Sequence, residues 1–179
     1  MKTTNLSALL LAGCCTLLPA LALALPSDSD QPIHIQADTA DLDDKKGTAI
    51  YRGNVIITQG TLKITGHTVT LVQGKSGDVE YFKSVGNQAY YEQVPNEGDE
   101  LLKAWGNTIE YFMPKDTIVI TDQAKVSQGG NTSRGEKITY NVKQELVNVG
   151  RAKPGSVSQP EPRVHMVIQP KKKSGNSEQ

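Results

Sequence analysis

The segment Gly53-Asn54-Val55-Ile56-Ile57-Thr58-Gln59-Gly60 recurs without a gap 69 residues further along the chain. The correspondence continues into the next segment, so that Val55, Ile57, Gln59, Gly60, Gly66, Val69 and Leu71 match Ala124, Val126, Gln128, Gly129, Gly135, Ile138 and Tyr140. A weaker copy, Gly86-Asn87-Gln88-Ala89-Tyr90-Tyr91-Glu92-Gln93, lies between the two. A repeated strand-turn-strand unit predicts stacked copies with one shared core, because a single copy cannot bury its apolar face.

Apolar and polar residues alternate with a period of two around these copies, as at Leu62 and Ile64 or Ile118 and Ile120. Such alternation is typical of half-buried strands, and β-branched residues and tyrosines dominate it. Beyond the leader, no stretch keeps an apolar period of 3.6 for three turns, so the chain is predicted to be all-β. The strand spacing fits a sandwich, a barrel or a jelly roll. The repeat favours an open, stacked roll whose end strands keep unpaired edges.

Residues 1–24 have the pattern of a secretory signal peptide: Lys2, an apolar run, and Ala22-Leu23-Ala24 before a polar stretch. Cleavage after Ala24 is the favoured interpretation. Two alternatives are an uncleaved membrane anchor and a lipoprotein processed at Cys14, which follows Leu11-Ala12-Gly13. The sequence stays apolar after Cys14, which argues against the lipoprotein.

Both cysteines, Cys14 and Cys15, lie in this leader, so a chain cleaved after Ala24 has no disulfide, thiolate metal site or cysteine nucleophile. The chain has 19 basic and 19 acidic residues, and without Lys2 the balance is 18 to 19. A nearly neutral chain offers no field for nucleic acid. We therefore expect one domain over residues 25–150 that folds on core burial alone, followed by a C-terminal segment, 151–179, that holds a last edge strand and a flexible tail.

Two stretches resemble the LptA (OstA-like) family of periplasmic lipopolysaccharide transport proteins. They are Asp30-Gln31-Pro32-Ile33-His34-Ile35-Gln36-Ala37-Asp38 and Tyr51-Arg52-Gly53-Asn54-Val55-Ile56-Ile57-Thr58-Gln59-Gly60-Thr61-Leu62-Lys63-Ile64. Gly135-Glu136-Lys137-Ile138-Thr139-Tyr140 is similar to the closing motif of that family.

The resemblance implies an open, V-shaped β-jelly roll that binds the lipid A acyl chains of lipopolysaccharide in an apolar groove. It implies head-to-tail protomers that link an LptC-like protein of the inner membrane to an LptD-like protein of the outer membrane. The physics agrees, because each acyl methylene exposed to water costs about 0.8 kcal/mol and an alternating strand stack supplies a long apolar trough. The expected location is the periplasm.

The candidate lipid-binding residues are apolar or aromatic positions that share the inward face of the predicted strands. They are Ile33, Ile35, Val55, Ile57, Tyr91, Ile109, Tyr111, Met113, Ile120 and Tyr140. Ile33, Ile35, Tyr91, Tyr111 and Met113 are expected nearest the lipid, because an aromatic ring with a polar tip suits a groove with a wet rim. Any one of these residues could equally fill a packed core.

The remaining sequence features do not indicate a metal, cofactor or catalytic site. His34, His67 and His165 are dispersed and lack metal-ligand spacing, so no metal or cofactor is expected. The acidic cluster Asp38, Asp41, Asp43 and Asp44 is interpreted as a solvated loop, and Trp105 as core or edge packing. No nucleophile elbow or phosphate loop is present, so no enzymatic activity is expected. The alternative to a lipid bridge is a membrane-anchored or purely structural periplasmic β-protein of the same fold, acting as an assembly partner.

Overall fold

The computed structural model describes residues 28–150 and 163–170. The predicted signal peptide and most of the predicted tail lie outside these residues. The described chain is all-β, as the sequence predicted, apart from two short 3-10 helices, η1 (Asp28–Asp30) and η2 (Met113–Lys115). The strands are β1 (His34–Gln36), β2 (Thr39–Asp43), β3 (Thr48–Gln59), β4 (Leu62–Gln73), β5 (Val79–Gln93), β6 (Leu102–Phe112), β7 (Thr117–Gln128), β8 (Asn131–Asn141), β9 (Leu146–Gly150) and β10 (His165–Val167).

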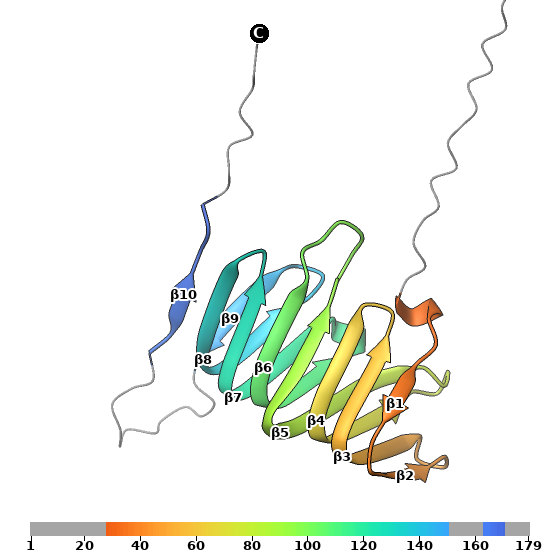
Figure 1. Ribbon diagram of the computed structural model, residues 1–179. Coiled ribbons are helices and arrows are strands. Elements are labelled where there is room, and N and C mark those ends of the chain that lie inside the picture. The colour runs from red at the N-terminus through yellow and green to blue at the C-terminus, as the bar shows by residue number, and fades with distance from the viewer. Residues whose placement is uncertain (1–27, 151–162, 171–179) are drawn as a thin grey trace, which may run out of the picture.

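All of these strands form one antiparallel sheet that does not close on itself (Figure 1). Six long strands, β3 to β8, pair with their neighbours in chain order. At one end of the stack β3 pairs with both β1 and β2, and at the other end β8 pairs with both β9 and β10. At each end of the stack, two short strands therefore take the place of one long strand.

The long strands bend in the middle, and each bend coincides with a shift in pairing register. The shifts fall between Arg52 and Val55, Thr65 and Thr68, Val85 and Ala89, Trp105 and Thr108, and Thr121 and Ala124. The bends divide the sheet into two leaves. Leaf 1 comprises residues 55–59, 62–66, 89–93, 102–106, 124–128 and 131–135 with β1 and β10. Leaf 2 comprises residues 48–52, 68–73, 79–85, 108–112, 117–121 and 137–141 with β2 and β9.

Two kinds of residue alternate at these bends. The strands that run from leaf 2 to leaf 1 contain residues with positive φ, such as Gly53 in β3, Gln88 in β5 and Asp122 in β7. The strands that run back contain a glycine with no room for a side chain. A Cβ at Gly66 would overlap Ser84 Oγ, and one at Gly106 would overlap Ile120 Cγ2. The two leaves converge at this vertex, so only small residues fit between them.

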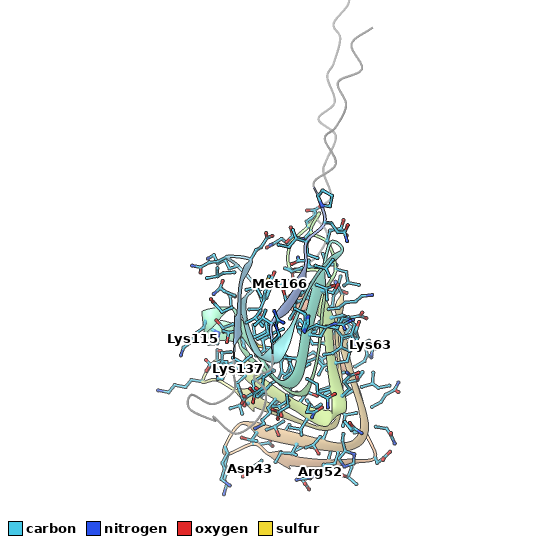
Figure 2. All side chains as sticks on the ribbon, turned by 90° about the vertical axis from the view of Figure 1, so that its left-hand side faces the viewer. Asp43, Arg52, Lys63, Lys115, Lys137 and Met166 are labelled. Carbon is cyan, nitrogen blue, oxygen red and sulfur yellow. The ribbon has the colours of Figure 1, made fainter. Side chains whose placement is uncertain are left out.

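The hydrophobic core fills the space between the leaves. Alternate residues of each strand point into it, and most of their partners across the strands are apolar, with Ser84 and Ser133 as buried polar exceptions. In Figure 2, viewed along the stack, the leaves enclose this interior, and Lys63 and Lys115 lie on opposite outer sides. The period-two pattern of the sequence therefore corresponds to an inner apolar face and an outer polar face.

Two local interpretations were wrong. The acidic cluster is only in part a loop, because Asp41 and Asp43 lie on strand β2 with Leu42 between them, whereas Asp38 and Asp44 lie just outside that strand. Trp105 is neither in the core nor at a sheet edge: it lies on the outer face of leaf 1, where it contacts the ring of Tyr90 at a centroid distance of 5.3 Å.

Candidate functional site

The interior surface consists of rows of side chains that run the length of the stack, one residue from each strand. Leaf 1 contributes Ile35, Ile57, Ile64, Tyr91, Ala104, Val126, Ser133 and Met166. Leaf 2 contributes one row of Leu42, Ala49, Leu71, Phe82, Tyr111, Ile118, Tyr140 and Val147. Its second row, nearer the vertex, is Ala40, Tyr51, Val69, Ser84, Ile109, Ile120, Ile138 and Val149. These rows form one apolar surface from β1 and β2 to β9 and β10.

The middle of this interior is filled by an aromatic cluster that spans the two leaves. The ring of Tyr91, from leaf 1, lies 6.0 Å from Phe82 and 6.1 Å from Tyr111, both from leaf 2. Tyr91 and Phe82 have no exposed surface. Burial raises the pKa of Tyr91 well above its ordinary value, since a phenolate would be poorly solvated there. The centre of the groove is therefore packed, not open.

Three glutamines form a polar line along the rim of leaf 1, at equivalent positions in the register of the sheet. Gln59 Nε2 donates to the carbonyl oxygen of Gln31 (3.0 Å), and Gln128 Nε2 donates to that of Glu100 (3.2 Å). Gln93 Nε2 donates to the carboxylate of Asp28 (2.9 Å). The three glutamines, two of which the 69-residue repeat preserves, thus attach preceding segments of the chain to the rim.

One rim contact joins the two leaves directly. Tyr140 Oη, on leaf 2, donates a hydrogen bond of 2.8 Å to Gln128 Oε1, on leaf 1. Burial, with the nearby carboxylates of Glu145 and Asp99, raises the pKa of Tyr140 to about 12. The phenol is therefore protonated and able to donate at neutral pH. In contrast, Tyr91 Oη donates to Gln93 within its own strand (2.5 Å).

The interior opens at both ends of the stack. A hollow of about 210 Å³ at the β1–β2 end is lined by Ile33, Ile35, Leu42, Tyr51 and Leu71, among others. A hollow of about 430 Å³ at the β8–β9 end is lined by Val126, Gln128, Tyr140 and Val147, with Asp99, Glu100 and Glu145 at its edge. The hollow at the β1–β2 end has a mainly apolar lining, which suits a hydrocarbon ligand, whereas the hollow at the β8–β9 end combines apolar with polar and acidic side chains.

The structure places the ten predicted residues on the interior side, but in three different environments. Val55, Ile57, Tyr91, Ile109, Ile120 and Tyr140 are buried within the packed core. Ile35, Tyr111 and Met113 are partly buried against it. Ile33 is 45% exposed at the β1–β2 end. Tyr91, expected near the lipid, is thus in the closed centre.

Sequence reasoning missed several interior residues. Phe82 is central to the aromatic cluster, but the neighbouring Tyr81 obscured which of the two faces inward. Leu42 was hidden within the acidic cluster, although Ala40 and Leu42 alternate with aspartates as a strand requires. Met166 extends the leaf 1 row on β10.

Residues 28–150 and 163–170 contain no group of three or more histidine, cysteine or acidic side chains that could hold a metal. In the same residues no helix is long and apolar enough to span a membrane. The site is an elongated apolar interior with polar rims and two open ends. An open antiparallel sheet folded over such an interior defines the class: an open β-jelly roll with an apolar interior and two open ends.

Comparison with known proteins narrows this class to one family. Residues 34–146 match the model of the LptA/(LptD N-terminal domain) LPS transport protein family, and the chain belongs to this family. The resemblance in its motifs is thereby confirmed.

The sequence similarity to individual relatives extends over most of the chain. It is 52% identical to the lipopolysaccharide export system protein LptH of Pseudomonas aeruginosa over 174 residues, covering 97% of this chain and 99% of LptH. It is 34% identical to the LptA export protein of Escherichia coli K12 over 147 residues, covering 80% and 78% of the two chains.

The crystal structure of LptH is described as that of the LptA-homologous periplasmic component of the lipopolysaccharide transport device of P. aeruginosa. It superposes with a TM-score of 0.70 at 54% identity and covers 81% of this chain and 100% of that chain. The relatives are thus named as transport components.

Proposed function

We propose that this protein is a non-enzymatic periplasmic carrier that binds the lipid A acyl chains of lipopolysaccharide between its leaves. It passes the lipid from an LptC-like protein of the inner membrane to an LptD-like protein of the outer membrane, through protomers stacked head to tail. The names of its relatives support the lipid and the compartment. The partners and the stacking are those that the family resemblance implies, and the two open ends of the sheet support the stacking.

The observation that carries this proposal is the exposure of interior-facing apolar residues at both ends. Leu42 is 67% exposed at the β1–β2 end, and Met166 is 54% exposed at the β10 end. Both belong to rows whose middle members are buried, such as Phe82 in the row of Leu42 and Tyr91 in the row of Met166. A monomer gains nothing by exposing the ends of its core, whereas a further protomer would continue the rows and cover them.

The transport mechanism follows from the uniformity of the rows. Apolar contacts are non-directional and scale with buried area, so an acyl chain finds similar affinity at each rung. The polar sugar part of the lipid remains at the rim, where the glutamines and loops are hydrated. The packed centre must open for the lipid to pass, and the two leaves can separate because they are joined covalently only at the bends.

A photo-crosslinking amino acid tests the site. Placed at Ile33, at the mouth of the β1–β2 hollow, it is expected to capture lipopolysaccharide. Placed at Lys63, on the outer face of leaf 1, it is expected to capture none (Figure 2). Equal labelling at the two positions would contradict an interior lipid site.

The second candidate is a purely structural β-protein whose two ends hold other proteins. The packed centre favours it, because Tyr91 and Phe82 leave no room for an acyl chain in this conformation. Native mass spectrometry of freshly purified protein separates the two candidates, since only the carrier is expected to co-purify with a glycolipid.

A further inference from the structure

The segment that precedes β1 is attached to the rim of leaf 1 through one carboxylate. Asp28, in η1, accepts hydrogen bonds from the backbone N–H and from the hydroxyl of Thr61, each of 2.7 Å. It accepts a third, of 2.9 Å, from Gln93 Nε2. Thr61 lies in the turn between β3 and β4, and Gln93 is the last residue of β5. The carboxylate thus joins η1 to the rim ends of neighbouring strands (Figure 1).

The turn between β3 and β4 leaves the space that this attachment needs. Gly60 has a φ of 57°, which favours glycine, and a Cβ there would overlap the carboxylate of Asp28. Three residues further on, the carbonyl oxygen of Gln31 accepts the hydrogen bond from Gln59. Residues 28–31 are therefore held on the rim at two points, and we call them the rim latch.

Asp28 also fixes the orientation of the Gln93 amide. A carboxylate has no proton to donate, so the amide nitrogen of Gln93 must face it and the amide oxygen must face the other way. That oxygen accepts the hydrogen bond of 2.5 Å from Tyr91 Oη. The result is a chain of hydrogen bonds from Tyr91 through Gln93 to a charged acceptor. Hydrogen bonds in such a chain polarise one another, and the charge strengthens the last of them.

Tyr91 is the interior end of this chain. Its side chain is fully buried, and its ring packs between the leaves against Phe82 and Tyr111. An acyl chain can pass the centre only if this ring leaves its place. The hydroxyl must then give up the hydrogen bond that Gln93 offers.

A similar arrangement near the β8 end of the rim lacks the charge. Gln128 accepts from Tyr140 (2.8 Å) and donates to the backbone carbonyl of Glu100 (3.2 Å). A neutral acceptor at a longer distance holds the amide less firmly than a carboxylate does. The charged acceptor is thus found behind the tyrosine that fills the centre of the stack.

We propose that Asp28 is a positioning residue for lipid passage: through Gln93 it holds Tyr91 in the closed centre, and release of the rim latch allows acyl chains to pass. This inference rests on the proposed function and assigns the control of its interior site. Asp28 is half-buried at the rim and outside the core cluster, so its replacement by alanine leaves no cavity among the apolar rows.

The rate at which a fluorescent lipopolysaccharide binds tests the role of Asp28. This rate scales with the fraction of molecules whose centre is open. Asp28→Ala is expected to raise it roughly five- to tenfold, the effect of losing one charge-assisted hydrogen bond. Glu97→Ala is the matched control, because it removes the same charge from an exposed position in the loop after β5. An unchanged rate in Asp28→Ala, or equal acceleration in the two variants, would overturn the assignment.

An exchange of the two polar groups separates positioning from a general loss of structure. Gln93→Glu alone sets two carboxylates side by side, and their repulsion is expected to raise the rate as well. Asp28→Asn in the same chain supplies an amide that donates to the new carboxylate, which still accepts from Tyr91. We expect this double variant to return to within about twofold of the wild-type rate, since the chain of hydrogen bonds is complete again. Acceleration that persists or grows in the double variant would overturn the role of Gln93.

The same measurements distinguish this inference from the proposed function. A wild-type protein that binds no lipopolysaccharide would overturn the carrier and the rim latch together. Lipopolysaccharide binding at a rate that is insensitive to Asp28 would overturn the rim latch alone.

Discussion

At the scale of single residues, Tyr140 is the polar side chain that holds the two leaves together across the rim. Its hydroxyl donates to Gln128, and Gln128 in turn donates to the carbonyl of Glu100. We expect Tyr140→Phe to lower the free energy of unfolding by about 1 kcal/mol, the usual contribution of one hydrogen bond. Hydrogen exchange should also become faster at residues 124–128 and 137–141. Tyr91→Phe is the control, because its hydrogen bond stays within one leaf. Equal acceleration in the two variants would show that Tyr140 is not a tie between the leaves.

The raised pKa of Tyr140 predicts that the free energy of unfolding decreases in alkaline solution. The pKa of Tyr140 is raised from 10.0 to about 12 by burial and by the nearby Glu145 and Asp99. The folded state therefore favours the protonated phenol, and this contribution is fully present below pH 10. It is lost as the pH rises from 10 through 12. Unfolding experiments between pH 9 and 12 should show the decline, and it should be shallower in Tyr140→Phe. A stability that stays constant to pH 12 would contradict the prediction.

At the scale of strands, the bends depend on glycines that occupy the vertex. A Cβ at Gly66 would overlap the Ser84 hydroxyl and lie 3.1 Å from the Val85 carbonyl oxygen. Since backbone cannot move aside cheaply, we expect Gly66→Ala to destabilise the fold by roughly 1–3 kcal/mol. Gly150→Ala is the matched control, because a Cβ there meets nothing within 4 Å. Urea denaturation of the two variants measures the difference, and similar midpoints would argue against a crowded vertex.

The strands themselves were largely predictable, whereas their bends and ends were not. The alternation at Val55 and Ile57 or Ile118 and Ile120 identified inner faces, because period two is a local property. A bulge such as that at Gln88 shifts the alternation by one residue, and its place depends on the neighbouring strand. Leu42 was not predicted as an interior residue, because its neighbours on β2 are charged. The burial of Tyr91 depends on the separation of two leaves, which no local pattern encodes.

At the scale of the whole molecule, the packed centre sets a condition on transport. The aromatic cluster of Phe82, Tyr91 and Tyr111 occupies the path between the two end hollows. If acyl chains pass through the interior, as we propose, the leaves must separate by at least the breadth of a chain. The Tyr140–Gln128 contact must then break in each transport step, at the modest cost of one hydrogen bond.

Locking the leaves therefore gives a prediction for the intact protein. Tyr140→Cys and Gln128→Cys, in a chain with Cys14→Ser and Cys15→Ser, are joined with a short bifunctional thiol reagent. We expect the joined protein to lose binding of a fluorescent lipopolysaccharide, because the interior can no longer widen, while the unjoined variant binds. The control joins Ser127→Cys to Thr132→Cys, whose native hydroxyls lie 3.3 Å apart within leaf 1. That link leaves the two leaves free to separate, so binding should persist. Unimpaired binding by the locked protein would mean that lipid reaches its site without separation of the leaves, at the open ends or on the outer surface.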